Sequence, residues 1–340
     1  MRTSTNRVVV GLDNGGNVNN ATALETTGRF LVDGLIESPS LVREGPDIAI
    51  DALARTFDNV LALTGTAKAA VLAIGLDTPG LASAEGVISS RGSTNFSHPA
   101  WRSFDIRSGL EDRLQLPVIY NNDGNAAALY AHRMHFGSAG GEHSSIAAIV
   151  GTGLGGGVIE AGLVVKGASG MAGELGHVYI PMAGLLADDQ PIPRCNCGFV
   201  GDAESVASLT GIENNLLPYW LTQFPDHPLG AIEMPDEAAR QVRFYGQVGD
   251  EMALRIFEQQ AMALGRLFTI AANYTDPSVY FLGGGVVEST PAFRDWFMGK
   301  VREHTVLRDE QTRLASFAVV PDLDMAGARG AALAALATLL

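Results

Sequence analysis

The chain has 340 residues, of which 46% are hydrophobic and 18% charged, a composition that can bury a large core and at this length favours two domains. Its 23 basic and 37 acidic residues leave a net charge of −14, so binding to a nucleic-acid backbone is not expected. No apolar run in the sequence is long enough for a membrane span, and two cysteines are compatible with a reducing compartment. We therefore expect a cytoplasmic protein without nucleic-acid or membrane partners.

The first half of the chain alternates predicted strands with predicted helices. Apolar runs, helical periodicity and turn residues predict the elements in chain order. They are a strand over 7–12 that enters the glycine turn 13–17, a hairpin over 21–32 with its turn at Thr27–Gly28, a helix over 46–63 that begins at Pro46, a buried strand over 69–76, a helix near 105–115, a strand over 117–121, and a helix after Asp123.

The second half is more helical. Residues 144–165 predict two strands around a glycine turn, and 248–273 predict one long amphipathic helix. A buried strand over 278–285, a strand over 315–320 and an alanine-rich helix over 326–340 follow. Proline and aspartate predict loops at 184–193 and 218–236.

One weak repetition stands out: a strand, a glycine turn and a hairpin occur at 7–32 and again at 146–165. The turns DNGGN and GTGLGGG can expose backbone N–H groups that bind phosphate. Neither turn is followed by GK[ST] or opens a helix, so neither matches a P-loop or a dinucleotide motif. Each alone is explained by a tight β-turn. Two turns in matching contexts, together with a third glycine cluster at 283–285, favour a binding site for nucleotide phosphates.

The two cysteines lie in the stretch PRCNCGFVGDAES (193–205). A disulfide between positions i and i+2 would close a very small ring, which disfavours it. Two free thiols are possible, but apolar packing gives no reason to cluster them here. Alternatively, two thiolates on one loop could supply half of a tetrahedral zinc site.

Seven motifs carry a family resemblance over nearly the whole chain. They are DNGG at 13–16, TPG at 78–80, NNDGNAAAL at 121–129, GTGLGGG at 151–157, GELGH at 173–177, CNCGFVGDAE at 195–204 and LGGGV at 282–286. In this order and spacing they resemble the ROK sugar kinases, within the actin-like and hexokinase-like ATPase superfamily. The resemblance implies an α/β fold of two actin-like (ribonuclease H-like) lobes with a ligand cleft between them. The expected lobes are residues 1–121 plus about 325–340, and residues 122–324.

The resemblance implies ATP-dependent phosphorylation of a hexose or a closely related sugar, with Mg²⁺ as cofactor and a homodimer as assembly. Asp123 matches the family's general base, although an N-cap is the ordinary role of an aspartate at a helix start. The residues that match sugar-binding positions are Gly80, Asn95, Asn122, Asp123, Glu174, His177 and Glu204. Those that match or extend the phosphate-binding turns are Asp13, Gly15, Gly16, Asn17, Gly151, Thr152, Gly153, Gly155, Gly283 and Gly284.

The chain departs from the family pattern at two positions. The family's structural zinc is held by a histidine and three cysteines, whereas here Asp202 stands in place of the third cysteine beside His177, Cys195 and Cys197. Carboxylate oxygen is an accepted zinc ligand, so these four residues are the expected zinc set. Asn17 replaces the usual threonine, whose hydroxyl meets phosphate. Loss of the metal is expected to weaken sugar binding and to leave ATP affinity near normal.

Other functions of the same fold stay open. A sugar-responsive regulator would carry a helix-turn-helix segment before the first strand, which these residues do not offer. A catalytically weak sugar-binding pseudokinase or sensor is suggested by Asn17 and Asp202. A kinase of N-acetylmannosamine, allose or a cyclitol is a further alternative to a glucokinase-like enzyme.

Overall fold

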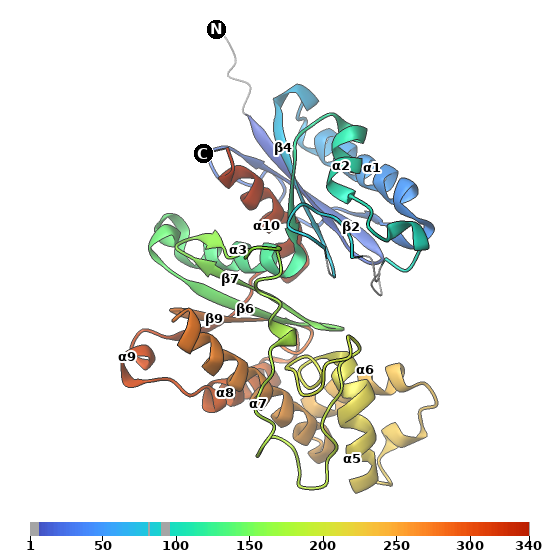
Figure 1. Cartoon of the computed structure of the whole chain (residues 1–340), viewed down its shortest axis with the longest axis vertical. Helices are drawn as coiled ribbons and strands as arrows, with labels where there is room; N and C mark the ends of the chain where they lie inside the picture. Colours follow the sequence, from blue (N-terminus) through green and yellow to red (C-terminus); the bar gives the residue numbers. More distant parts are fainter. Residues whose placement is uncertain (1–6, 81, 90–95, 340) are drawn as a thin grey trace. The chain divides into compact units, whose positions relative to one another are not determined.

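The computed structural model describes residues 7–80, 82–89 and 96–339, and its contacts divide the chain into two compact units. Unit 1 comprises Met1–Gly141, Gly157–Gly173 and Val320–Leu340, and unit 2 comprises Glu142–Gly156 and Glu174–Val319. Each unit contains helices and strands of the α/β type (Figure 1). Among the described residues, no helix has the length and apolar content needed to cross a bilayer.

Unit 1 is built on a sheet in the order β3-β2-β1-β4-β5. The central strand β1 pairs antiparallel with β2 and parallel with β4, which in turn pairs parallel with β5. The strands are β1 (Val8–Asn14), β2 (Val18–Glu25), β3 (Glu37–Pro39), β4 (Val71–Thr78) and β5 (Val118–Asn122). The helices of this unit are α1 (Pro46–Thr64), α2 (Ile106–Leu114), α3 (Asp123–Phe136) and α10 (Leu323–Ala337).

Alternating side chains of β1 pack on both faces of this sheet. Val8 and Val10 belong to the core formed with α1 and α2, whereas Val9 packs with Ala332 and Ala335 of α10. Figure 1 shows α1 and α2 on one side of the sheet and α10 on the other. Because strand residues alternate with a period of two, Gly11 and Asp13 share the α10 face with Val9.

The α10 backbone lies directly on the sheet because the strands present glycines to it. A Cβ atom on Gly11 would stand 1.9 Å from the Ala328 carbonyl oxygen, and one on Gly75 would stand 1.9 Å from that of Ala331. The same helix meets α3 at Gly330, where a Cβ atom would lie 1.8 Å from the Ala126 carbonyl oxygen. Any side chain at these positions would push the elements apart.

The second sheet has the order β10-β9-β6-β7-β8. Its strands are β6 (Ser145–Val150), β7 (Leu154–Glu160), β8 (Leu163–Val164), β9 (Val279–Gly284) and β10 (Ser316–Val319). The helices of unit 2 are α4 (Leu209–Gly211), α5 (Leu217–Gln223), α6 (Pro235–Gln247), α7 (Glu251–Tyr274), α8 (Pro291–His304) and α9 (Asp309–Thr312). The ring of Phe268 on α7 packs 5.2 Å from Tyr280 of β9 and 6.2 Å from Phe317 of β10, centroid to centroid.

Most predicted elements form where the sequence indicates, including Pro46 in the first turn of α1 and the turn before Gly28, whose φ is 90°. The repeated strand–turn–strand pattern is confirmed as the β1–β2 and β6–β7 hairpins. The loop expected over 218–236 is wrong in part, because residues 217–223 form α5, with Leu217 buried at its start. The expected lobe boundary near residue 121 differs from the unit boundary, since α3 packs against α10 in unit 1. The division into family lobes stays a prediction.

Replacing Gly75 by alanine is expected to destabilise the protein by about 2 kcal/mol or more, because the new methyl group meets a helix backbone that cannot rotate away. The measurement is the melting temperature by calorimetry. Gly34→Ala is the control, since nothing lies within 4 Å of a Cβ atom there. Equal melting temperatures for the two variants would contradict the close contact.

Candidate functional site

A row of four polar side chains crosses the first sheet at the carboxyl ends of β1, β4 and β5. The register partners along the row are Asn20, Asp13, Asp77 and Asn121. Register partners project from the same face of a sheet, and Asp13 identifies that face. Its Cγ lies 2.9 Å from the position of a Cβ atom on Gly327 in the second turn of α10. The row therefore lies beneath the positive N-terminal end of α10.

Asp77 is the functional candidate that the sequence analysis did not single out. Its side chain is fully buried, and no N–H or O–H donor of the described residues reaches either carboxylate oxygen. Asp77 is the register partner of Asp13 on the neighbouring strand, so the two carboxyl groups lie next to each other. Burial raises the pKa of Asp77 well above its usual value, and the charges of Asp13 and Asp123 raise it further. The available signal was an acidic residue ending a strand next to the strand of Asp13.

The start of α3 shows which residue caps the helix, a role that the sequence could not assign between Asn122 and Asp123. Asn122 is the N-cap, because its Oδ1 accepts the N–H groups of Gly124 at 2.9 Å and Asn125 at 3.4 Å. Its Nδ2 donates to the carbonyl of Gly80 at 3.4 Å, and Gly80 has a φ of 88°. Asp123 is the first helical residue, and its Oδ1 accepts from Gly124 at 2.7 Å. The capping interpretation of Asp123 is therefore wrong.

The first glycine turn joins β1 to β2. The Gly15 N–H donates to the Val18 carbonyl at 2.9 Å, which closes the turn, and Asn17 is exposed at its tip. Gly16 is half-buried between them. The predicted sugar-loop residue Asn95 lies outside the described residues.

The second glycine turn joins β6 to β7 in unit 2. The Gly151 N–H donates to the Gly153 carbonyl at 2.9 Å, and Gly151, Thr152 and Gly155 are exposed. Gly283 and Gly284 are buried at the end of β9, where Gly284 is the register partner of Val150. A Cβ atom on Gly284 would lie 2.1 Å from the Val150 carbonyl oxygen, so close strand packing already accounts for this glycine.

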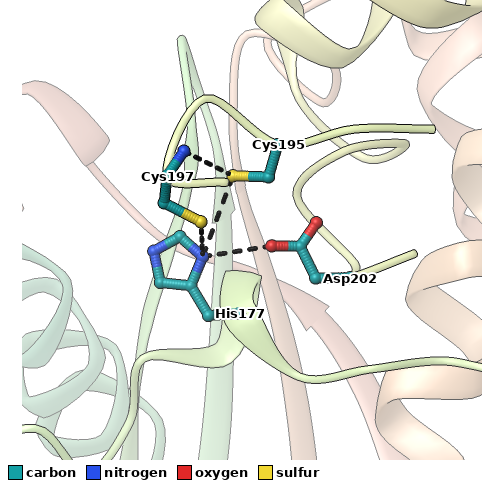
Figure 2. Close-up of side chains that lie close together, drawn as sticks. All are labelled: His177, Cys195, Cys197 and Asp202. Carbon is teal, nitrogen blue, oxygen red and sulfur yellow. Dashed lines mark hydrogen bonds and ion pairs between the residues drawn. The ribbon is translucent and has the colours of Figure 1, made fainter. Parts of the chain in front are cut away.

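Four side chains of unit 2 converge on one point, as Figure 2 shows. The Nδ1 atom of His177 lies 3.2 Å from Oδ2 of Asp202, 3.6 Å from Sγ of Cys197 and 4.0 Å from Sγ of Cys195. All four ligand atoms lie within 4.8 Å of one another. Zinc bonds of about 2.0–2.3 Å in a tetrahedron require ligand atoms about 3.3–3.8 Å apart, which these separations approach. The cluster can therefore hold a zinc ion after small side-chain adjustments.

Short backbone pairings hold this cluster together. A bridge between Arg194 and Val200 closes the cysteine loop, in which the Cys197 N–H donates to Sγ of Cys195 at 3.4 Å. A second bridge joins Tyr179 to Asp202, so that His177 and Asp202 face each other. The other Asp202 oxygen accepts the Ser205 N–H at 3.0 Å, which fixes the carboxylate plane.

Without a metal ion the cluster is an ion pair flanked by thiols. The hydrogen bond to Asp202 raises the pKa of His177 to about 9, and burial raises that of the Cys195 thiol. Burial acts to raise the pKa of Asp202, but its hydrogen bonds with His177 and Ser205 leave that pKa lowered. Burial also raises the pKa of Glu174, a neighbour of His177 in the chain.

Glu204 lies between the cluster and the second glycine turn. Its Oε1 accepts from Sγ of Cys195 at 3.2 Å, and its Oε2 accepts from the Leu154 N–H at 2.8 Å. The charges of His177 and Glu204 both act on Glu174, so the structure brings the three predicted sugar-binding residues of unit 2 together.

The melting temperature of Asp77→Asn minus that of the natural protein is expected to increase as the pH rises from 5 to 8.5. The pKa of Asp77 is higher in the folded than in the unfolded chain, so between the two values the folded state binds the extra proton. The natural protein therefore loses stability as the pH rises through the raised pKa, whereas asparagine stays neutral and can donate to Asp13. Thermal unfolding without nucleotide or magnesium measures the difference.

The control is Asp105→Asn, which exchanges the same groups at the cap of α2, where the aspartate pKa is lowered. Its melting-temperature difference should be flat over this pH range. A flat or falling difference for Asp77→Asn would contradict the raised pKa of Asp77.

Comparison with known proteins identifies the family. The ROK family model matches residues 9–338. The chain is 30% identical over 308 residues to the glucokinase of Halalkalibacterium halodurans, covering 88% of this chain and 86% of that protein. It is 28% identical to the glucokinase of Thermotoga maritima over 328 residues, covering 95% and 96%. The crystal structure of a ROK hexokinase from Thermus thermophilus matches with a TM-score of 0.76 and 29% identity over 98% of this chain and 99% of that one. The two five-stranded sheets with their helices, together with the match to this structure, show the actin-like ATPase fold. The family model shows that the chain belongs to the ROK family.

Proposed function

We propose that this protein is a sugar kinase, which transfers the γ-phosphoryl group of ATP to a hydroxyl of a hexose or a closely related sugar, with Asp123 as the general base. The observation that carries the proposal is the start of α3, where Asn122 provides the cap and Asp123 is not needed for it. The glucokinase and hexokinase relatives support the reaction class.

In this reaction Asp123 accepts the proton of the sugar hydroxyl. The hydroxyl oxygen then forms a bond to the γ-phosphorus while the bond to the departing ADP oxygen breaks. Asp13 is the carboxylate we assign to magnesium, which when bound would neutralise part of the phosphate charge. The fit rests on the row beneath α10, where Asp13 is half-buried beside Asp77, whose pKa is raised by burial.

The binding roles follow the family pattern and stay predictions. We assign sugar contacts to Gly80, Asn95 and Asn122 of unit 1 and to Glu174, His177 and Glu204 of unit 2. We assign phosphate contacts to the turns that contain Gly15 and Gly153. Because Nδ1 of His177 faces the cluster, its Nε2 is the nitrogen assigned to the sugar.

We further propose that His177, Cys195, Cys197 and Asp202 hold a structural zinc ion. The support is the convergence of one imidazole, two thiols and one carboxyl oxygen within 4.8 Å. Binding would replace the proton of His177 and those of the thiols, so zinc affinity should rise with pH. A homodimer is expected on the family resemblance alone, and a cytoplasmic location on the composition of the sequence.

A sugar-binding pseudokinase is the second candidate, because the exposed Asn17 replaces a hydroxyl at the first phosphate turn. ATP consumption over a panel of glucose, mannose, N-acetylmannosamine, allose and a cyclitol separates the two. Turnover with one sugar supports the kinase, and sugar binding without turnover supports the pseudokinase.

Asp123→Asn is expected to lower kcat by about 10²–10⁴-fold, because the amide keeps the shape of the side chain but cannot take the proton. Sugar affinity, measured by calorimetry, should stay within a few-fold of the natural protein. Asp47→Asn, an exposed exchange in the first turn of α1, is the control for the substitution itself. Activity of Asp123→Asn within a few-fold of the natural protein would exclude Asp123 as the base.

Purified, tag-free protein is expected to contain about one zinc ion per chain, measured by elemental analysis. Asp202→Ala should lose zinc to a chelator more readily, and Asp202→Cys should retain it more strongly because it forms a three-thiolate shell. Asp188→Ala, at an exposed position on the preceding loop, is the control. Fully active protein with no metal would contradict the zinc site.

A further inference from the structure

We propose that Glu204 positions the second glycine turn for the nucleotide and couples its order to the state of the cysteine–histidine cluster. The inference rests on the proposed function, which assigns this turn to phosphate. It adds a role for Glu204 that is separate from sugar contact.

One oxygen of Glu204 lies in the concave side of the turn. Oε2 accepts the Leu154 N–H at 2.8 Å, and a Cβ atom on Gly153 would stand 2.6 Å from this same oxygen. Gly153 has no positive φ that would require glycine. Space for the Glu204 carboxylate is therefore the physical reason for a glycine at this position.

The other oxygen faces the cluster. Oε1 accepts from Sγ of Cys195 at 3.2 Å, and Cys195 is 8% exposed. The Glu204 backbone is fixed as well, since its N–H donates to the Gly176 carbonyl at 2.8 Å, next to His177. One side chain thus connects the predicted metal ligands with the predicted phosphate turn.

The residues after Glu204 hold the remaining peptide groups of the turn. The Leu209 N–H donates to the Gly151 carbonyl at 3.0 Å. The Thr152 carbonyl accepts both the Thr210 N–H at 3.1 Å and the Thr210 hydroxyl at 2.8 Å. Because these bonds orient the peptide planes of the turn, movement of the 202–210 segment changes the directions of the N–H groups on which phosphate depends.

Metal binding acts on this segment from its other end. A zinc ion would tie Asp202, two residues before Glu204, to Cys195, Cys197 and His177, and would restrict the motion of the loop. A metal-bound thiolate has no S–H group, so in the zinc form the restricted 202–210 segment, and no longer the Cys195 thiol, would hold Glu204 on the turn. We therefore expect zinc removal to weaken nucleotide binding, in contrast to the expectation from the sequence.

The test is the Kd of the non-hydrolysable ATP analogue AMP-PNP without sugar, measured by calorimetry on the full chain. Glu204→Ala is expected to weaken binding about tenfold, the effect of losing a hydrogen bond to a charged acceptor. Glu204→Gln should stay within about threefold, because its amide oxygen can still accept the Leu154 N–H. Glu233→Ala is the matched control: it truncates an exposed glutamate of the same unit that has no assigned role, and should leave AMP-PNP affinity unchanged.

The coupling arm compares zinc-loaded with chelator-treated protein. Chelation should raise the Kd of AMP-PNP several-fold in the natural protein and not in Glu204→Ala, and by linkage AMP-PNP should tighten zinc by the same factor. If Glu204→Ala fails to fold, Gly153→Ala replaces it, because its methyl group displaces the carboxylate and should weaken AMP-PNP binding likewise.

Two results would overturn the inference. AMP-PNP affinity in Glu204→Ala equal to or tighter than that of the natural protein would show that Glu204 does not position the turn. A natural protein that does not bind AMP-PNP at all would overturn the proposed function together with the inference.

Discussion

The backbone contact between α10 and the first sheet is the constraint on which unit 1 depends. It requires glycine at Gly11 and Gly75, two residues before Asp13 and Asp77 on their strands and on the same face of the sheet. The helix therefore places its N-terminal turns over this acidic pair. Because α10 comes from the end of the chain and β1 from its start, the environment of these aspartates is complete only after both ends have folded together. At Gly330 the same helix also packs against α3, and so fixes the position of the helix that begins with Asp123.

In unit 2 a backbone pairing between two loop segments holds the candidate site residues in place. Residues 176–180 run alongside 201–204, with the Ala203 N–H donating to the Val178 carbonyl at 2.9 Å and the Ile180 N–H to that of Gly201 at 3.2 Å. This pairing brings His177 to Asp202 and Glu204 to the glycine turn. A substitution in the cysteine loop is therefore expected to affect Glu204 as well as the cluster, because Asp202 and Glu204 lie on the same segment.

The sequence was sufficient for features that depend on local pattern. Apolar periodicity predicted α1 and α7, and glycine spacing predicted both hairpin turns. It was not sufficient for Asp77, because an acidic residue at a strand end acquires meaning only when the register places it beside Asp13. It also left Asn122 and Asp123 undivided between capping and catalysis, since both are good caps and only the geometry shows which amide hydrogens are met.

The chain has a net charge of −14, so the proposed binding of ATP phosphates depends on groups at the site and not on the overall charge. Two ionised carboxylates at Asp13 and Asp77 would place two negative charges side by side at the site we propose for magnesium and phosphate. Burial raises the pKa of Asp77 and so favours its neutral form, which removes one of these charges, and the N-terminal end of α10 offsets part of the other. The remaining charge is then that of Asp13, the carboxylate we propose for magnesium. Burial of Asp77, which is costly for a charged group, is thus compatible with an anionic ligand because this side chain is kept neutral.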